Sequence, residues 1–282
     1  MKLGFSSCCY PHRNLLENLL FAKEQGFDFV ECMNIHIDKI LQSIELTDSL
    51  NHRLRELPMG LTIHHALPQP DNDGKVAVFK QSIQKIFAWL TANPGLAQVL
   101  SFDTWVDRQA SLPLLLWVLE MFKDMDIPIA TEDYPLNARD AESWKEAMAY
   151  PHFCILSDLA HTNVRLCDTG SQKIWCLLNE GENLPLPAGD NSAEAFENAL
   201  RKKPRPIVEI HIHNNNGLQD QHLSIADGTA DYSKIVPILK KIGFDGLVNI
   251  ETTPTIHGIH GEAADKMLLA DRDLWRELWK NH

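Results

Sequence analysis

The feature that most constrains this chain is a regular alternation of short β-rich runs with longer amphipathic stretches. Eight such runs recur along the 282 residues, and the segments between several of them repeat their apolar residues at intervals of three and four. We expect strands at residues 3–7, 27–32, 60–64, 98–102, 127–132, 153–158, 207–213 and 247–251. This alternation is typical of a parallel sheet, because each helix carries the chain back to the start of the next strand.

The stretches between the runs are predicted to be amphipathic helices that lay one apolar stripe on the sheet. They cover residues 14–25, 76–91, 112–123, 141–149, 192–202, 232–241 and 263–280. Two of them lead into matching connections, because a helix ends at Gly26 and again at Gly243, and a strand starts within three residues. Glycine suits this position, since a left-handed helix cap is adopted most easily without a Cβ.

Eight β–α units close into a barrel more naturally than they extend an open sheet. Barrels of this kind commonly take about 250 residues as one domain. No Gly-x-Gly-x-x-Gly motif follows the first strand to indicate a nucleotide-binding open sheet, and no Pro- or Ser-rich linker divides the chain. We therefore predict one (β/α)8 TIM-barrel domain over residues 1–282, with a long lid-like insertion at residues 162–191 after the sixth strand.

Charge and hydropathy narrow the classes of partner. The formal net charge of -12 repels polyanions, and the one dense basic cluster, at residues 201–205, is interpreted as a solvated helix end. Nucleic acid and membrane are therefore not expected as partners. No apolar run approaches the roughly 18 residues that span a bilayer, so a cytoplasmic protein is the default expectation. The sequence is compatible with a homodimer, which is the commonest oligomeric state of proteins that assemble.

Four consecutive predicted strands carry an ionisable residue at or near their ends. The fifth ends at Glu132, the sixth at Asp158 and the eighth at Glu251, while the seventh contains His211. In a barrel these ends converge on one mouth, where carboxylates and an imidazole need a cation among them. Mixed oxygen and nitrogen ligands suit Mn, Mg, Co or Zn without selecting one. The sequence therefore predicts a divalent-metal site built from these four residues.

A second group of ionisable residues lies just beyond these strand ends. His161 follows the sixth strand, and Asp220 and His222 lie in the loop after the seventh. They are candidates to face the same pocket as ligands or substrate contacts, and a capping or loop-bracing role is the alternative for each. His213 shares the barrel face of His211 only if the strand continues, and we expect it to support a ligand rather than to bind the metal.

Together these motifs resemble those of the xylose isomerase-like TIM-barrel superfamily. The segments that carry the resemblance are Glu132, Asp158-Leu159-Ala160-His161, His211-Ile212-His213-Asn214-Asn215, Asp220-Gln221-His222 and Glu251-Thr252-Thr253. The resemblance covers nearly the whole chain and is specific at superfamily level. This superfamily contains sugar and sugar-phosphate isomerases and epimerases alongside abasic-site nucleases of the endonuclease IV type.

In the isomerase and epimerase branch, the resemblance implies one metal held by Glu132, Asp158, His211 and Glu251. Glu132 and Glu251 would double as the acid/base pair on opposite faces of a bound sugar, while the metal polarises substrate oxygens. The resemblance also implies that His161 contacts a substrate oxygen. We expect a small carbohydrate or polyol without phosphate, because residues 217–230 and 252–264 contain no Arg or Lys.

In the nuclease branch, the resemblance implies further metal sites. His65 on the third strand and a histidine on the fourth would join Glu132, and His161, Asp220 and His222 would form another site. The fourth strand offers Asp103 in place of histidine, which changes the charge and the metal preference. Metal-assisted phosphodiester hydrolysis is therefore the alternative to isomerisation or epimerisation. A barrel that binds a metal or ligand without turnover is the second alternative.

Overall fold

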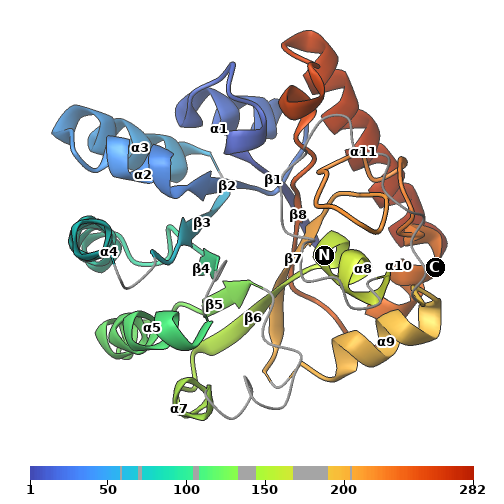
Figure 1. Cartoon of the computed structure of the whole chain (residues 1–282). Helices are drawn as coiled ribbons and strands as arrows, with labels where there is room; N and C mark the ends of the chain where they lie inside the picture. Colours follow the sequence, from blue (N-terminus) through green and yellow to red (C-terminus); the bar gives the residue numbers. More distant parts are fainter. Residues whose placement is uncertain (58, 69–71, 104–107, 133–143, 168–189, 204) are drawn as a thin grey trace.

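Eight parallel strands close into a barrel in sequence order, with β8 pairing back onto β1 (Figure 1). The computed structural model describes residues 1–57, 59–68, 72–103, 108–132, 144–167, 190–203 and 205–282. The strands are β1 (Lys2–Ser6), β2 (Phe29–Met33), β3 (Gly60–Ala66), β4 (Val99–Asp103), β5 (Ile129–Glu132), β6 (Phe153–Asp158), β7 (Ile207–Ile212) and β8 (Leu247–Ile250). Every one of them overlaps its predicted run, so the predicted (β/α)8 fold is confirmed.

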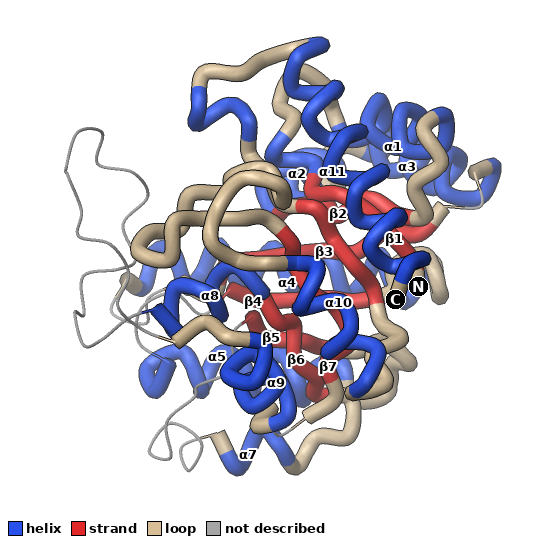
Figure 2. The backbone as a smooth tube through the Cα atoms, turned by 90° about the vertical axis from the view of Figure 1, so that its right-hand side faces the viewer, coloured by secondary structure: helices blue, strands red, loops and turns tan. Residues whose placement is uncertain are grey.

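Helices surround the barrel on its outer side (Figure 1 and Figure 2). They are α1 (Leu15–Glu24), α2 (Asn34–Ile40), α3 (Ile44–Glu56), α4 (Asp73–Ala92), α5 (Arg108–Phe122), α7 (Lys145–Met148), α8 (Leu159–Cys167), α9 (Ala193–Arg201), α10 (Tyr232–Lys241) and α11 (Glu262–Asn281), with 3-10 turns η1 (Ser7–Cys9) and η2 (Pro254–His257). None of the described helices has both the length and the apolar character needed to cross a membrane.

Three of these helices, α2, α3 and α8, are absent from the sequence-based prediction. In α3 only Leu50 and Leu54 are buried, so its apolar repeat is too sparse to stand out in the sequence. The helix instead begins at a polar cap, because the Ser43 hydroxyl accepts a hydrogen bond from the backbone N–H of Leu46. The helix predicted at residues 141–149 is reduced to α7, and residues 141–143 lie outside the described residues.

The insertion predicted at residues 162–191 begins too early. Residues 162–167 are the second half of α8 and are largely buried, and the Thr162 hydroxyl donates to the Asp158 carbonyl. Asn163 donates to Asn215 and Thr229, which ties α8 to the loop after β7. This polar stretch can be a buried helix rather than an exposed loop because its polar side chains have hydrogen-bond partners inside the protein. Residues 168–189 of the predicted lid lie outside the described residues.

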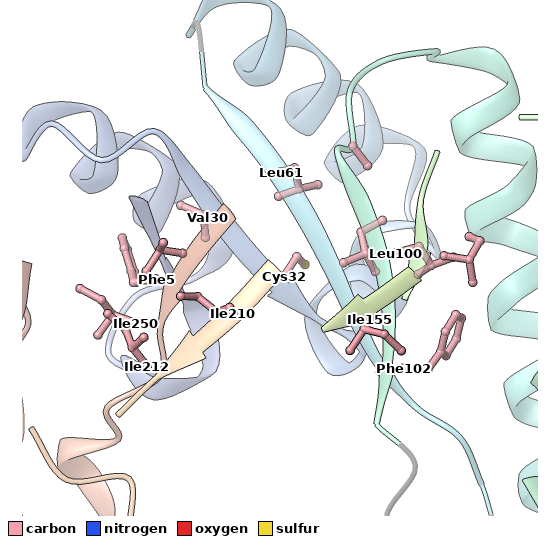
Figure 3. Packing of buried hydrophobic residues seen from close by; sticks show 14 of the residues in the cluster. Phe5, Val30, Cys32, Leu61, Leu100, Phe102, Ile155, Ile210, Ile212 and Ile250 are labelled. Carbon is pink, nitrogen blue, oxygen red and sulfur yellow. The ribbon is translucent and has the colours of Figure 1, made fainter. Parts of the chain in front are cut away.

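Alternation of side chains along the strands divides the buried residues into two layers. The larger layer lies between strands and helices and includes Phe5, Leu100 and Ile210 (Figure 3). A smaller, separate cluster fills the inside of the barrel with Phe29, Val99, Ala130, Cys154, Leu156 and Leu247. Two residues further along five of these strands lie Glu31, Ser101, Glu132, Asp158 and Asn249, so the interior changes from apolar to polar towards the mouth.

Glycine is required at one point of the inner cluster. A Cβ on Gly4 of β1 would lie 2.6 Å from the Phe29 ring, which is closer than van der Waals contact allows. Gly4 therefore leaves room for the largest side chain of the inner cluster. Its neighbour in the register, Asn249 on β8, belongs to the polar layer above.

The C-terminal helix α11 is connected to the mouth of the barrel through Asp271. This buried carboxylate accepts hydrogen bonds from the Ser224 hydroxyl at 2.5 Å, the Ile225 backbone N–H at 3.1 Å and the Thr252 hydroxyl at 2.7 Å. It thus joins the loop after β7 to the end of β8. Burial raises the pKa of Asp271 to about 6, although these hydrogen bonds act in the opposite direction.

We predict that Asp271→Asn changes the pH dependence of stability. Because the folded-state pKa lies above the unfolded value, the stability contributed by Asp271 is fully present below about pH 4 and is lost as pH rises through about 6. The free energy of unfolding of Asp271→Asn relative to the parent should therefore rise by up to roughly 3 kcal/mol between pH 4 and pH 7. Urea unfolding at both pH values measures this difference, and a pH-independent difference would contradict the assignment.

Candidate metal centre

Glu132, Asp158, His211 and Glu251 converge at the mouth of the barrel. Each offers a ligand atom, and these four atoms all lie within 4.8 Å of one another. All four side chains are buried. The parallel register brings them together, because Asp158 on β6 is opposite His211 on β7, and Glu251 directly follows β8. The four strand-end residues singled out in the sequence are thus neighbours in space.

His211 shows most directly that these residues suit a cation. Its Nδ1 atom lies 2.9 Å from Glu251 Oε2 and 3.8 Å from Glu132 Oε1. Burial alone would lower the pKa of His211, but the carboxylates of Glu251 and Glu31 raise it well above the ordinary value. A positive charge between Nδ1 and the carboxylates, carried by a proton or a metal ion, is therefore strongly favoured.

Glu251 is surrounded by imidazoles. Burial would raise the pKa of its carboxyl group, but His211, first of all, and His222 lower it well below the ordinary range. The carboxylate is therefore ionised at neutral pH. An ionised, buried carboxylate beside an imidazole nitrogen is a suitable ligand for a divalent ion.

The histidine of β3 that reaches this site is His64, and the structure does not bring His65, the residue expected there, to the site. His64 Nε2 lies 3.4 Å from Glu132 Oε2, and its Nδ1 lies 2.9 Å from the Ser101 hydroxyl. Together with Asp103 and Glu132 it forms a further cluster of candidate ligands. Asp103, expected in place of a histidine, thus stands at this cluster on the end of β4.

His65 lies on the opposite side of β3, between the barrel and the helices. Its Nε2 lies 3.2 Å from the Ser82 hydroxyl, and its ring packs edge-on against Phe79. The physical reason is strand alternation, because neighbouring residues point to opposite faces of the sheet. The register pairs His65 with the apolar Phe102 and His64 with Ser101, and this difference in polarity is the signal by which the sequence could have separated the two histidines.

A second set of side chains, His161, His213, Asp220 and His222, lies against the first. His161 Nε2 and His222 Nε2 each lie 3.1 Å from Asp220 Oδ2, and His161 Nδ1 lies 3.3 Å from Glu132 Oε1. His213 contacts Asp158 Oδ2 at 3.0 Å, and its ring stacks on that of His222. Combinations of these residues form two more candidate ligand clusters, Asp158-His161-His213 and His213-Asp220-His222.

The charges of this second set are strongly coupled. Burial would lower the pKa of His222, but Asp220 raises it to about 10, and the Glu251 carbonyl accepts a hydrogen bond from its Nδ1. His222 is also the one non-glycine residue of the described chain with a positive φ, at 48°. Such backbone strain is retained where the surroundings fix a side chain, and here they hold His222 between Asp220 and Glu251.

Glu31 is a site residue that the sequence reasoning missed. It lies on β2, is fully buried, and its Oε2 accepts a hydrogen bond from His211 Nε2 at 3.0 Å. An acid near the end of a predicted strand was the available signal, and it follows the pattern of Glu132 and Asp158. Site residues were predicted on the third to the eighth strand, and β2 was not among them.

Comparisons with known proteins agree with this architecture. Residues 19–277 match the family model described as xylose isomerase-like TIM barrel. A D-tagatose 3-epimerase-like protein is similar in structure, with a TM-score of 0.66 and 19% identity over 98% of this chain and 99% of that chain. The IolI protein with a bound zinc atom has a TM-score of 0.70 and 15% identity over 100% and 99% of the two chains.

One curated relative matches a short part of the chain. An uncharacterized protein of Methanocaldococcus jannaschii is 42% identical over 61 residues, which are 22% of this chain and 20% of that protein. The chain thus aligns with about a fifth of the length of this relative.

We predict that His64→Gln and His65→Gln have different effects. His64→Gln should weaken zinc binding by about tenfold, because it removes a nitrogen next to the Glu132 carboxylate. His65→Gln should leave zinc binding unchanged and lower the free energy of unfolding by roughly 1–2 kcal/mol, since it disturbs a buried hydrogen bond to Ser82. Calorimetric zinc titration and urea unfolding of both variants test this, and the opposite assignment of effects would show that His65 faces the site.

Proposed function

Because the chain belongs to the xylose isomerase-like TIM barrel family, we propose that it is a divalent-metal-dependent isomerase or epimerase acting on a sugar or related polyol. The observation that carries the proposal is the buried convergence of Glu132, Asp158, His211 and Glu251, whose ligand atoms lie within 4.8 Å of one another. The similarity in structure to a D-tagatose 3-epimerase-like protein and to a protein with a bound zinc atom supports it. The expected substrate is a small molecule, not a nucleic acid.

The donor set fits a divalent cation. Three carboxylates would neutralise its charge, and Nδ1 of His211, which faces Glu251, would supply a nitrogen ligand. This mixture of oxygen and nitrogen ligands suits Mn, Mg, Co or Zn. When bound, such an ion would polarise the carbonyl and hydroxyl oxygens of the substrate and make the adjacent C–H bond more acidic.

Glu132 and Glu251 are proposed as the acid/base pair. Glu132 ends β5 and Glu251 follows β8, three strands further round the barrel, so the two carboxylates approach the mouth from different sides. One carboxylate would accept the proton from the substrate C–H and become a carboxylic acid. The other would return a proton, to the same carbon in an epimerisation or to the neighbouring carbon in an isomerisation.

His161 is proposed as a contact to a substrate oxygen. It lies between Glu132, 3.3 Å from its Nδ1, and Asp220, 3.1 Å from its Nε2. Asp220 would hold the ring in place, and a ring N–H can donate a hydrogen bond to an oxygen that gains negative charge. This contact would stabilise the enediolate that forms when the C–H proton leaves.

Metal-assisted phosphodiester hydrolysis is the second candidate, and one observation favours it. Two further clusters of candidate ligands lie at the mouth beside the four-residue site. One is His64-Asp103-Glu132, which has Glu132 in common with that site, and the other is His213-Asp220-His222. Hydrolysis of a phosphodiester commonly uses two or three ions to activate water and to neutralise the leaving oxygen. The number of bound ions therefore distinguishes the two candidates, and a barrel that binds without turnover would show a metal but no reaction.

We predict about one divalent ion per chain in the purified protein, with loss of that ion in Glu251→Gln. The reason is that Glu251 is both a predicted ligand and the carboxylate nearest to His211 Nδ1. Elemental analysis of parent and variant measures this. Two or three zinc ions per chain would instead favour the phosphodiesterase, and protein that takes up no ion under any loading condition would exclude both catalytic candidates.

We predict that turnover of a responsive sugar in deuterated water places deuterium on the reacting carbon. Glu132→Gln and Glu251→Gln should each reduce kcat by at least about a hundredfold, because each removes one member of the acid/base pair. Mass spectrometry of the product and steady-state kinetics measure the two effects. If both variants kept full turnover, the assignment of the pair would be wrong, and transfer without deuterium would indicate a hydride shift.

A further inference from the structure

We infer that Glu31 is the positioning residue of the metal centre: by accepting the Nε2–H of His211 it directs Nδ1 of that ring at the metal position. The inference rests on the proposed metal site and adds to it a residue of β2, three strands before Glu132, the first of the four predicted ligands in sequence order. Glu31 would affect metal affinity and ligand geometry without contacting the metal itself.

The contacts of Glu31 join the two strands that carry His211 and Glu251. Its Oε2 accepts from His211 Nε2 at 3.0 Å, and its Oε1 accepts from Asn249 Nδ2 at 2.9 Å. His211 and Asn249 are register partners on β7 and β8, and Glu251 is two residues beyond Asn249. The Glu31 carboxylate therefore sits across the inside of the barrel beneath the metal position and holds both strands at fixed points.

The tautomer of His211 follows from these contacts. A neutral imidazole carries one N–H, and a hydrogen bond to a carboxylate at one nitrogen leaves the lone pair on the other. Since Glu31 accepts at Nε2, the neutral ring that binds a metal would carry its lone pair on Nδ1, the atom that lies 2.9 Å from Glu251 Oε2. Rotation of the ring would break the bond to Glu31 inside a fully buried site.

A carboxylate behind a ligating histidine also makes the imidazole a stronger electron donor. Loss of such a partner typically weakens metal binding by about 10- to 100-fold. Asp158 and His213 repeat the pairing at the next ligand, because His213 Nε2 lies 3.0 Å from Asp158 Oδ2. For His211, however, Glu31 is the acceptor whose contact fixes which nitrogen faces the other ligands.

Glu209 provides a matched control inside the same barrel. It is also fully buried and lies on β7, but its carboxyl group accepts a hydrogen bond from the Thr62 hydroxyl at 3.4 Å rather than from His211. Glu31→Gln and Glu209→Gln each replace one buried carboxyl group by an amide of equal size. A general loss of barrel packing would affect both variants, whereas a positioning role would affect only Glu31→Gln.

The experiment is a cobalt(II) titration of the full-length protein after removal of bound metal, followed by its visible absorption spectrum. Glu31→Gln should bind cobalt about 10- to 100-fold more weakly than the parent and with a changed spectrum, while Glu209→Gln should stay within about threefold with the parental spectrum. Glu31→Asp, which keeps the charge but is one methylene too short to reach His211, should resemble Glu31→Gln and serves as the test if Glu31→Gln does not fold.

The outcomes separate this inference from the proposed function. A parent protein that binds cobalt together with Glu31 variants that bind it equally well, with the same spectrum, would overturn the positioning role and leave the metal site standing. Equal weakening in Glu31→Gln and Glu209→Gln would also overturn it, since packing would then explain the loss. A parent protein that binds no cobalt would overturn the proposed metal site and this inference together.

Discussion

Mutual repulsion among buried carboxylates is the constraint on which the mouth of this barrel depends. Glu132, Asp158 and Glu251 are all buried, and their ligand atoms share a space only 4.8 Å across with His211. Like charges at such distances inside a protein oppose folding unless a positive charge lies between them. The imidazoles around them supply part of this charge, and a divalent ion would supply the rest.

The barrel scaffold is what makes this concentration of charge tolerable. Glu132 and Asp158 each lie two residues beyond an apolar side chain of the inner cluster, and Glu251 lies four residues beyond Leu247, so the same strand alternation that fills the base also directs the acids to the mouth. Connections outside the barrel then fix the loops, as Asp271 does for the end of β8 and Asn163 for the loop after β7. The strands and these loop contacts thus hold the buried carboxylates close together despite their repulsion.

The sequence predicted the barrel and its four strand-end residues because both depend on local patterns. Short β-rich runs with an acid at the end are visible in any single strand, as in Ile129–Glu132 and Phe153–Asp158. The choice between His64 and His65 depends instead on which face of β3 points inwards, and that is decided by pairing with β4. The helix α8 was missed because its polar residues are satisfied by contacts with a distant loop.

The apolar cluster inside the base of the barrel has a consequence for exchange with solvent. Phe29, Leu156 and their neighbours fill the end opposite the mouth, and Glu31 and Glu209 have no exposed surface. Glu31 therefore lies between this apolar packing and the proposed ligands at the mouth. A bound ion at the mouth would further restrict the access of solvent to Glu31. Hydrogen exchange of the groups next to Glu31 should therefore become slow while the ion stays in place.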